Sequence, residues 1–208
     1  MEPFTRLAGI AAALPLDNVD TDMIWPAGPH ISLRRGEQQR NAFARLRFQE
    51  GSGEEEPGFV LNREPWRNAR ILVTGRNFGC GSSREMAVWS LYEWGLRCII
   101  APSFGDIFAA NAALNGLLPV ELPEAVVAGL MERAADPARC VMEIDLVGCR
   151  VRAEGIDIGF TVDSHRRGCL LAGLDETGFT LALMPVVAAF GENYLTEYPW
   201  TVPVAEEG

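Results

Sequence analysis

The segment Gly79–Glu85 reads Gly-Cys-Gly-Ser-Ser-Arg-Glu and places two hydroxyls and a guanidinium directly after a glycine-rich turn. The apolar run Ile71–Thr74 before it predicts a buried strand, and Arg84–Trp94 after it predicts a helix. The polar groups therefore lie at the start of a helix, where backbone N–H groups lack partners and the helix dipole is positive. Such an end binds anions, and an arginine there can bind a carboxylate through two parallel hydrogen bonds. The turn predicts an anion site.

Part of this pattern also fits helix capping. Ser82 and Glu85 match the S-x-x-E pattern of a capping box, in which the glycines only shape the turn. Capping does not account for Ser83 and Arg84, because neither needs to be polar for that purpose. The segment Ser103–Asp106 repeats the S-x-x-D spacing without the glycines or the arginine, and there we expect plain capping.

Nucleotide-binding turns fit the segment less well. The dinucleotide fingerprint G-x-G-x-x-G lacks its third glycine here, and no acidic residue ends the next apolar run, Cys98–Ala101. The Gly-Lys-Ser/Thr sequence of a P-loop is absent as well. Both interpretations are therefore disfavoured.

Two further groups of polar residues are candidates for the same site. Asp20-Thr21-Asp22 has the spacing of a turn whose side chains accept from nearby N–H groups, and a metal role would need more oxygen ligands. Arg34-Arg35 lies in a loop, and Arg166-Arg167 follows His165. Paired arginines are usually solvated, but in a lid over a carboxylate site they can select the substrate.

The elements around these residues predict an α/β fold. An N-terminal strand is expected at Leu7–Leu16, and a strand–helix–strand unit ends with Cys98–Ala101. Alternating polarity after Cys140 predicts hairpin strands of an antiparallel sheet. The remaining expected helices are Asp106–Leu114, Glu124–Ala135 and Asp163–Ala172, and the remaining strands are Leu117–Leu122, Met142–Leu146, Arg150–Arg152 and Phe160–Val162.

Length and composition predict one domain over residues 1–208. A chain of 208 residues, 48% of them hydrophobic, can bury one good core. Residues 27–60 are rich in Gly, Pro, Arg and Gln and predict a long loop, with one helical patch around Gln39–Arg47. Residues 198–208 predict a tail.

Charge and cysteine content exclude several classes of function. The net charge of −10, from 28 acidic and 18 basic residues, disfavours nucleic-acid and anionic-membrane partners. Five scattered cysteines predict free thiols in a reducing cytoplasm, and no zinc or iron–sulfur site is expected from this chain alone. No run has the length of a membrane span, and the N-terminal flank has no basic cluster typical of a signal peptide.

Several blocks together resemble the bacterial 3-isopropylmalate dehydratase small subunits, a family similar to the C-terminal swivelling domain of aconitases. The blocks, in order, are Asn18–Asp22, Asn77–Glu85, Ala101–Phe108, Asn115–Val120, Arg166–Cys169 and Gly173–Leu181. The resemblance covers nearly the whole chain. It implies an aconitase-like swivelling domain with a mixed, barrel-like sheet flanked by helices, and it implies that residues 27–60 form a mobile substrate loop.

The resemblance also implies an activity. Members of the family are hydro-lyases that interconvert 2- and 3-isopropylmalate by dehydration and rehydration in leucine biosynthesis. They work as heterodimers with a large subunit that holds a [4Fe–4S] cluster through three cysteines. This chain would then bind no metal itself and would act only with that partner on a small dicarboxylate.

Residue roles follow from the same resemblance. Ser82 would be the general base that takes the carbon-bound proton, and Ser83 and Arg84 would hold a substrate carboxylate and the developing negative charge. A serine hydroxyl is a weak base unless nearby groups activate it, and the helix start is suited to that role. Arg34 and Asp20-Thr21-Asp22 would line the substrate site, the latter by hydrogen bonding.

Two departures from the family pattern leave the substrate open. Met86 stands where many members have His, and Trp25-Pro26-Ala27 stands where many have Lys. A paralogous hydratase for another hydroxy-diacid, of the methylmalate or citraconate/maleate type, remains an alternative, as does a non-catalytic module for an anion or nucleotide. Ile31 and Leu33 are candidates to contact an isopropyl group.

Overall fold

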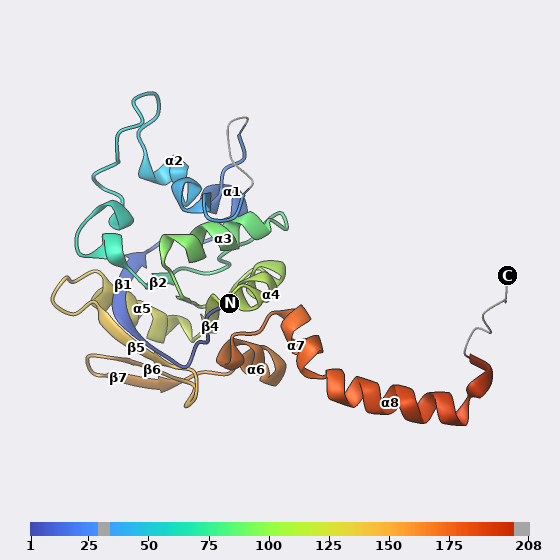
Figure 1. The fold of residues 1–208 in the computed structure, drawn as a ribbon. Helices are drawn as coiled ribbons and strands as arrows, with labels where there is room; N and C mark the ends of the chain where they lie inside the picture. The colour runs from blue at the N-terminus through green and yellow to red at the C-terminus, as the bar shows by residue number, and fades with distance from the viewer. Residues whose placement is uncertain (29–33, 202–208) are drawn as a thin grey trace.

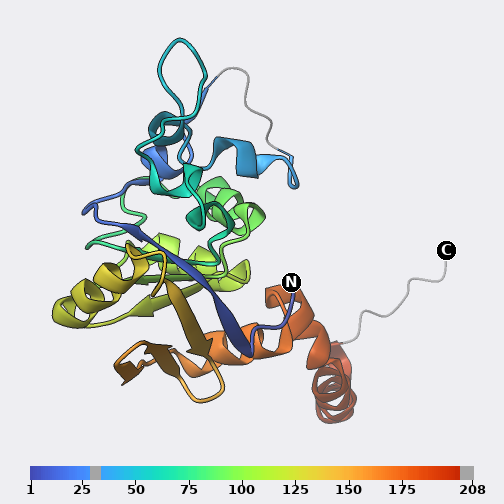
Figure 2. The same ribbon diagram turned by 90° about the vertical axis from the view of Figure 1, so that its left-hand side faces the viewer.

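A seven-stranded mixed sheet forms the centre of the computed structural model, which describes residues 1–28 and 34–201. The strand order is β4-β3-β2-β1-β5-β6-β7, and the curled sheet is visible in Figure 1 and Figure 2. Neighbours are parallel from β4 to β1 and antiparallel from β1 to β7. The strands are β1 (Arg6–Leu14), β2 (Ile71–Thr74), β3 (Cys98–Ala101), β4 (Leu118–Glu121), β5 (Val141–Asp145), β6 (Arg150–Ala153) and β7 (Ile156–Gly159). The predicted α/β class is confirmed.

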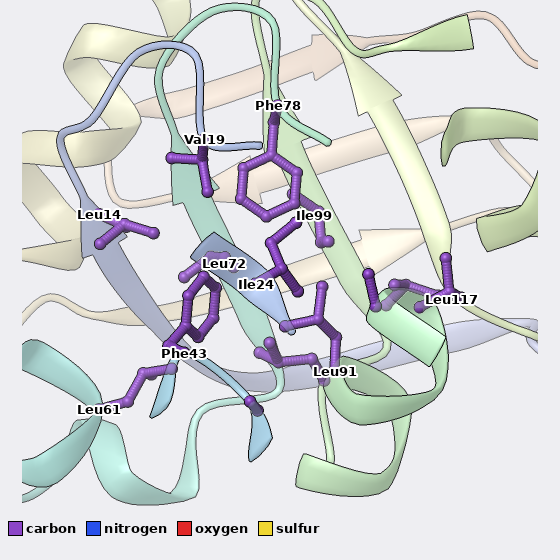
Figure 3. Packing of buried hydrophobic residues seen from close by; sticks show 14 of the residues in the cluster. Leu14, Val19, Ile24, Phe43, Leu61, Leu72, Phe78, Leu91, Ile99 and Leu117 are labelled. Atoms are coloured by element: carbon purple, nitrogen blue, oxygen red, sulfur yellow. The ribbon is translucent and has the colours of Figure 1, made fainter. Parts of the chain in front are cut away.

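The parallel strands are covered on both faces, which explains why β2 and β3 are apolar and completely buried. Successive side chains point to opposite faces, so Leu72 and Ile99 join one core and Ile71 and Val73 the other. Figure 3 shows the first core, in which Phe78 packs near Ile99. The helices that follow the strands are α3 (Glu85–Trp94), α4 (Asp106–Leu114), α5 (Glu124–Ala134) and α6 (Ser164–Ala172).

The long segment between β1 and β2 packs more closely than a surface loop. Its short helices are α1 (Thr21–Ile24), η1 (Gln38–Asn41), α2 (Ala44–Arg47), η2 (Val60–Asn62) and η3 (Trp66–Asn68). The helical patch expected around Gln39–Arg47 corresponds to η1 and α2. Phe43 and Leu61 are fully buried and lie in the core of Figure 3, so this segment also supports α3. Ile31 and Leu33 lie outside the described residues.

The strand expected at Phe160–Val162 is wrong. Gly155 adopts φ +70°, and the chain reverses at once, so that Ala153 pairs with Ile156 and β7 ends at Gly159. Phe160 then donates its N–H to the Cys149 carbonyl (3.0 Å) and is buried as the chain leaves the sheet. The alternation of Ile156 and Ile158 was the better strand signal.

The C-terminal region contains two helices that the sequence patterns left unassigned. After α6 come α7 (Glu176–Ala182), α8 (Met184–Glu197) and a single turn, η4 (Pro199–Thr201). Figures 1 and 2 both show α8, in orange-red, lying clear of the rest of the fold. No helix in the described part of the chain is long and apolar enough to cross a membrane.

Candidate active site

Three loops meet at the carboxyl edge of the parallel strands, where open α/β sheets bind ligands. The loop after β1 joins the loop after β2 through the Thr21 N–H to the Cys80 carbonyl (3.0 Å) and the Gly79 N–H to the Val19 carbonyl (2.7 Å). The loop after β2 joins the loop after β3 through the Phe78 N–H to the Ser103 carbonyl (3.1 Å). Backbone hydrogen bonds therefore fix the glycine-rich turn from both sides.

Glycine is required where this turn approaches α4. Gly79 adopts φ +74°, and a Cβ there would overlap Cγ of Phe108. A Cβ on Gly105 would lie 2.6 Å from the Gly79 carbonyl oxygen. Any side chain at either position would push the turn away from α4, so the two glycines set the shape of the site.

A pocket of about 190 Å³ lies at this junction. The turn contributes Cys80, Ser82, Ser83 and Arg84 to its lining, and the first turns of α4 contribute residues such as Asp106 and Asn111. The N-termini of α3 and α4 therefore both face the pocket, and each supplies N–H groups without intrahelical partners. Two helix dipoles pointing their positive ends at one space favour a bound anion.

The two serines present free hydroxyls to solvent. Ser82 and Ser83 are exposed, and neither hydroxyl bonds to any other residue in the described ranges. Their backbone is nevertheless held, because Thr21, only 3% exposed, donates its Oγ1–H to the Ser82 carbonyl (2.9 Å). The hydroxyls are thus available to a ligand on a fixed backbone.

Arg84 is oriented by a carboxylate from the loop after β1. Its Nη1 donates to Oδ1 of Asp22, and the Arg84 side chain is 24% exposed. Asp20 acts differently, because its Oδ1 accepts from the Met23 N–H (2.7 Å) and caps α1. The three residues of Asp20-Thr21-Asp22 therefore each bond to a different part of the site, and all three lie beside the turn.

The capping box expected at the turn is wrong. The N-cap of α3 is Arg84, no side chain caps this helix, and Ser82 lies two residues before it. Glu85 accepts from Nδ2 of Asn115 (2.9 Å) and does not reach back to the turn. The uncapped N–H groups remain open toward the pocket, which suits anion binding better than a capping box would.

Capping at Ser103 is wrong as well. The N-cap of α4 is Gly105, without a side-chain cap, and Oγ of Ser103 accepts from the Asn77 N–H (2.9 Å). The Ser103 side chain therefore connects the loop after β3 to the loop after β2. The helix begins after Gly105, because only a glycine fits this close to the turn.

The arginine pairs lie elsewhere. Arg34 does not line the pocket, and Arg35 lies 4.3 Å over the Trp89 ring and donates to Oδ1 of Asn115 (2.9 Å). Arg167 donates to the Leu146 and Val147 carbonyls (3.1 and 2.8 Å), which attaches α6 to the sheet. Arg167 therefore has a structural role, whereas Arg166 lines a separate pocket beside Asp163.

The first part of the 27–60 segment is attached to α3 by one carboxylate. Glu93 accepts from the Gly36 N–H through Oε1 (2.7 Å) and from the Gln38 N–H through Oε2 (2.6 Å). Oε1 of Gln38 in turn accepts from Nε1 of Trp25 (2.8 Å), which joins α3, Gln38 and the residue after α1. Arg34 lies next to this tether.

A second ion pair joins the loops at the rim. Asp17 accepts from the Arg76 N–H (2.8 Å) and from Nη2 of Arg76 (3.0 Å). These bonds, the backbone one first, lower the pKa of the Asp17 carboxyl below its usual range. The pair therefore stays charged and keeps the loops after β1 and β2 together.

The α4 contribution to the pocket was not foreseen. Asp106, Phe108 and Asn111 line the pocket, but the sequence patterns assigned α4 no role. The available signal was topological: in a parallel strand–helix–strand unit, the helix after β3 must begin at the same edge as the turn after β2.

The fold is an α/β domain with a glycine-rich turn open to a pocket at the carboxyl edge of its parallel strands, and residues 1–125 match the family model described as the aconitase C-terminal domain. Curated relatives carry a more particular name. The 3-isopropylmalate dehydratase small subunit of Rhodospirillum centenum is 47% identical over 97% of this chain and all of its own length, and that of Rhodospirillum rubrum is 44% identical over 99% of both. The chain belongs to the family of 3-isopropylmalate dehydratase small subunits.

A solved structure supports the fold. The 3-isopropylmalate dehydratase structure from Methanocaldococcus jannaschii aligns with a TM-score of 0.66 and 24% identity, over 88% of this chain and 98% of that one. The predicted family and fold are confirmed.

Proposed function

We propose that this chain is the small subunit of a 3-isopropylmalate dehydratase, a hydro-lyase that interconverts 2- and 3-isopropylmalate in leucine biosynthesis. The observation that carries the proposal is the Ser82-Ser83-Arg84 turn, open to a pocket at the start of two helices, in a chain 47% identical to a protein of that name. The relatives' names support isopropylmalate over another hydroxy-diacid.

Arg84 and Ser83 bind a substrate carboxylate in this proposal. The guanidinium uses one nitrogen for Asp22 and keeps further N–H donors for the ligand. Ser83 adds a hydroxyl, and the unpaired N–H groups at the start of α3 add partial positive charge. These groups lie on a backbone that Thr21 and Gly79 fix, so little reorganisation accompanies binding.

Ser82 takes the proton from the substrate carbon. Its exposed hydroxyl has no other partner in the described ranges, so its lone pairs can face the substrate. Loss of this proton and of the hydroxyl group on the neighbouring carbon leaves an alkene diacid. Water then adds back to the alkene with its hydroxyl on the carbon that lost the proton and its hydrogen on the carbon that lost the hydroxyl, which gives the other isomer. The positive helix ends stabilise the serine alkoxide and so increase the fraction of Ser82 that is ionised and able to accept the proton.

A large partner subunit completes the site. Within residues 1–28 and 34–201 no group of three His, Cys, Asp or Glu side chains is placed to hold a metal, and Cys80 is the one described cysteine that lines the pocket. A [4Fe–4S] cluster held by the partner supplies a Lewis acid for the substrate hydroxyl. All five cysteines of this chain are free thiols, which fits a heterodimer in the reducing cytoplasm.

Reconstitution tests this function. The chain, the large subunit and their mixture are assayed anaerobically with 2- and 3-isopropylmalate, following the alkene diacid by ultraviolet absorbance. We expect turnover from the mixture and none from either subunit by itself. A panel of 2-methylmalate, citraconate and maleate is run beside it. Turnover by the isolated chain would refute the two-subunit proposal, and preferred turnover of a smaller diacid would refute the assigned substrate.

A further inference from the structure

The C-terminal arm, residues 176–201, is largely apolar, and within residues 1–28 and 34–201 only its start is packed on the body, where Phe179 contacts the His165 ring with the centroids 4.5 Å apart. None of the residues of α7 and α8 is buried, and the nearest neighbours of α8 are α7 and η4. Figure 1 shows α8 extending away from the body. At the rise of an α-helix, its 14 residues span about 21 Å. Exposed apolar surface of this extent marks an interaction site in a stable protein.

One face of α8 carries exposed apolar side chains at helical spacing. Leu183, Val186, Val187, Phe190 and Tyr194 follow the spacing i, i+3, i+4, i+7 and i+11, which places them on one side of the helix. Their exposed fractions are 43%, 67%, 50%, 66% and 40%. The rings of Phe190 and Tyr194 stack with their centroids 5.7 Å apart. This spacing is typical of a helix that inserts into a hydrophobic groove.

The opposite side of α8 has a different character. Ala188, Glu192 and Thr196 lie at four-residue intervals on it, and none is a large apolar residue. Met184 and Leu195, both 48% exposed, lie beside Ala188 and widen the apolar side, so that the polar side of the helix is narrow and centred on Glu192. We therefore expect the apolar face to bind in a groove that covers one side of the helix. A site that enclosed the whole helix would also bury the Glu192 carboxylate at a large cost in free energy.

Charge distinguishes a second copy of this chain from a different partner. No charged residue occurs in 177–191, and the three charged residues of the arm, Glu176, Glu192 and Glu197, are all acidic. Glu192 lies on the opposite side, but Glu197 follows Phe190 by seven residues and therefore lies at the end of the apolar face. Two arms packed in parallel would place these like charges side by side, with no Lys or Arg on the arm to offset them. A groove with basic residues at its rim on another protein is complementary.

We infer that the apolar face of α8 docks into a hydrophobic, basic-rimmed groove on the large subunit. This identification of the partner rests on the proposed function. Relatives named as small subunits match this chain over 96% to 99% of its length, so an alignment over 207 of its residues includes the arm. The arm also begins beside the site, because Asp175, Glu176 and Thr177 line a second pocket together with Glu85, the residue after Arg84.

A charge-matched pair of variants tests the docking face. Val187→Glu/Phe190→Glu places two carboxylates on the apolar face, and Ala188→Glu/Thr196→Glu places two on the opposite face of the same helix. Each is made in the full chain and mixed with the large subunit. Binding is measured by sedimentation or light scattering, and circular dichroism of each isolated chain checks that the body is folded.

We expect the apolar-face variant to bind the large subunit about 100-fold more weakly or worse, since buried aromatic anchors dominate such interfaces. The control should bind within about 3-fold of wild type. The inference would be overturned if both variants bound the large subunit as well as wild type does, or if both lost the same amount of affinity. A wild-type self-association that only the apolar-face variant abolishes, with the complex unchanged, would assign the face to a second copy and overturn it too. Turnover by the wild-type complex is scored separately, so a failure of the proposed function leaves the docking result readable.

Discussion

At the residue scale, the site depends on groups that the turn brings together from distant parts of the chain. Asp22 and Arg84 are 62 residues apart and form an ion pair, and Thr21 bonds to the carbonyl of Ser82. A sequence motif indicates the types of residue present. Their arrangement depends on the sheet edge, because only there do the loops after β1, β2 and β3 meet.

The Asp22 carboxylate is expected to position Arg84. Asp22→Ala removes the partner that orients the guanidinium, and kcat/KM of the assembled complex should fall by about 10- to 100-fold, the range of a small misplacement of a binding group. Asp22→Asn keeps one acceptor and should recover part of the loss. Steady-state kinetics on isopropylmalate checks this, and an unchanged kcat/KM for Asp22→Ala would contradict the role.

At the element scale, the regular part of the fold was predictable from the sequence. The strands β2 and β3 and the helix α4 coincide with their expected ranges, because short β-branched runs and a helix ending at Asn115-Gly116 are strong local signals. The residues that cap these helices were not predictable in the same way. Ser82 and Ser103 have cap-like spacing, but with Gly79 and Gly105 in tight approach to their neighbours the N-caps of α3 and α4 are Arg84 and Gly105.

The sequence predicted the site residues that lie close together in the chain. It did not predict those that the fold brings to the pocket from another element. Ser82, Ser83 and Arg84 were identified from their turn, whereas Asn111 lines the same pocket from the next helix without any local signal. The arm was missed for a similar reason. The apolar residues of α8 have helical spacing but none is buried within the described ranges, so packing within the chain does not account for them.

Glu93 tethers the 27–60 segment to α3, and the tether is testable by proteolysis. Glu93→Ala removes two charge-assisted hydrogen bonds to backbone N–H groups, each worth about 1.5–3 kcal/mol. Trypsin cleavage after Arg34 and Arg35 should become at least about 10-fold faster. Glu37→Ala, at an exposed neighbour without a cap bond, is the matched control. Equal cleavage rates in the two variants would show that the carboxylate does not restrain the segment.

Asp145 should make the hairpin β5–β6 pH-dependent. Its carboxylate accepts from the Gly148 N–H (2.9 Å), and this bond, followed by Arg6 at 3.4 Å, lowers the pKa of the group. A lowered native pKa stabilises the fold above the unfolded value of about 3.9, and this contribution disappears as pH falls through the native value. Asp145→Asn should therefore reduce the free energy of unfolding at pH 7, with the difference from wild type shrinking below pH 4. Urea unfolding at several pH values measures it, and a constant difference would contradict the assignment.

At the scale of the whole molecule, the body and the arm have separate roles. The seven-stranded sheet with α3 to α6 holds the site, whereas α8 contacts α7 and η4 but adds nothing to the cores. Removing residues 183–208 should therefore change the Tm of the isolated chain by less than about 4 °C, a shift that about 1 kcal/mol produces. Differential scanning calorimetry checks this. A larger drop would mean that the arm stabilises the body.

The central claim is that the Ser82-Ser83-Arg84 turn performs half of a dehydratase reaction with Ser82 as the base. Its most direct test is the turnover of isopropylmalate by the complex carrying Ser82→Ala, compared with Ser164→Ala, which removes an exposed hydroxyl far from the turn in sequence. We predict that Ser82→Ala assembles normally but loses at least about 100-fold in kcat, as expected for a general base, and that Ser164→Ala keeps wild-type turnover. Near-normal kcat for an assembled Ser82→Ala complex would contradict the account.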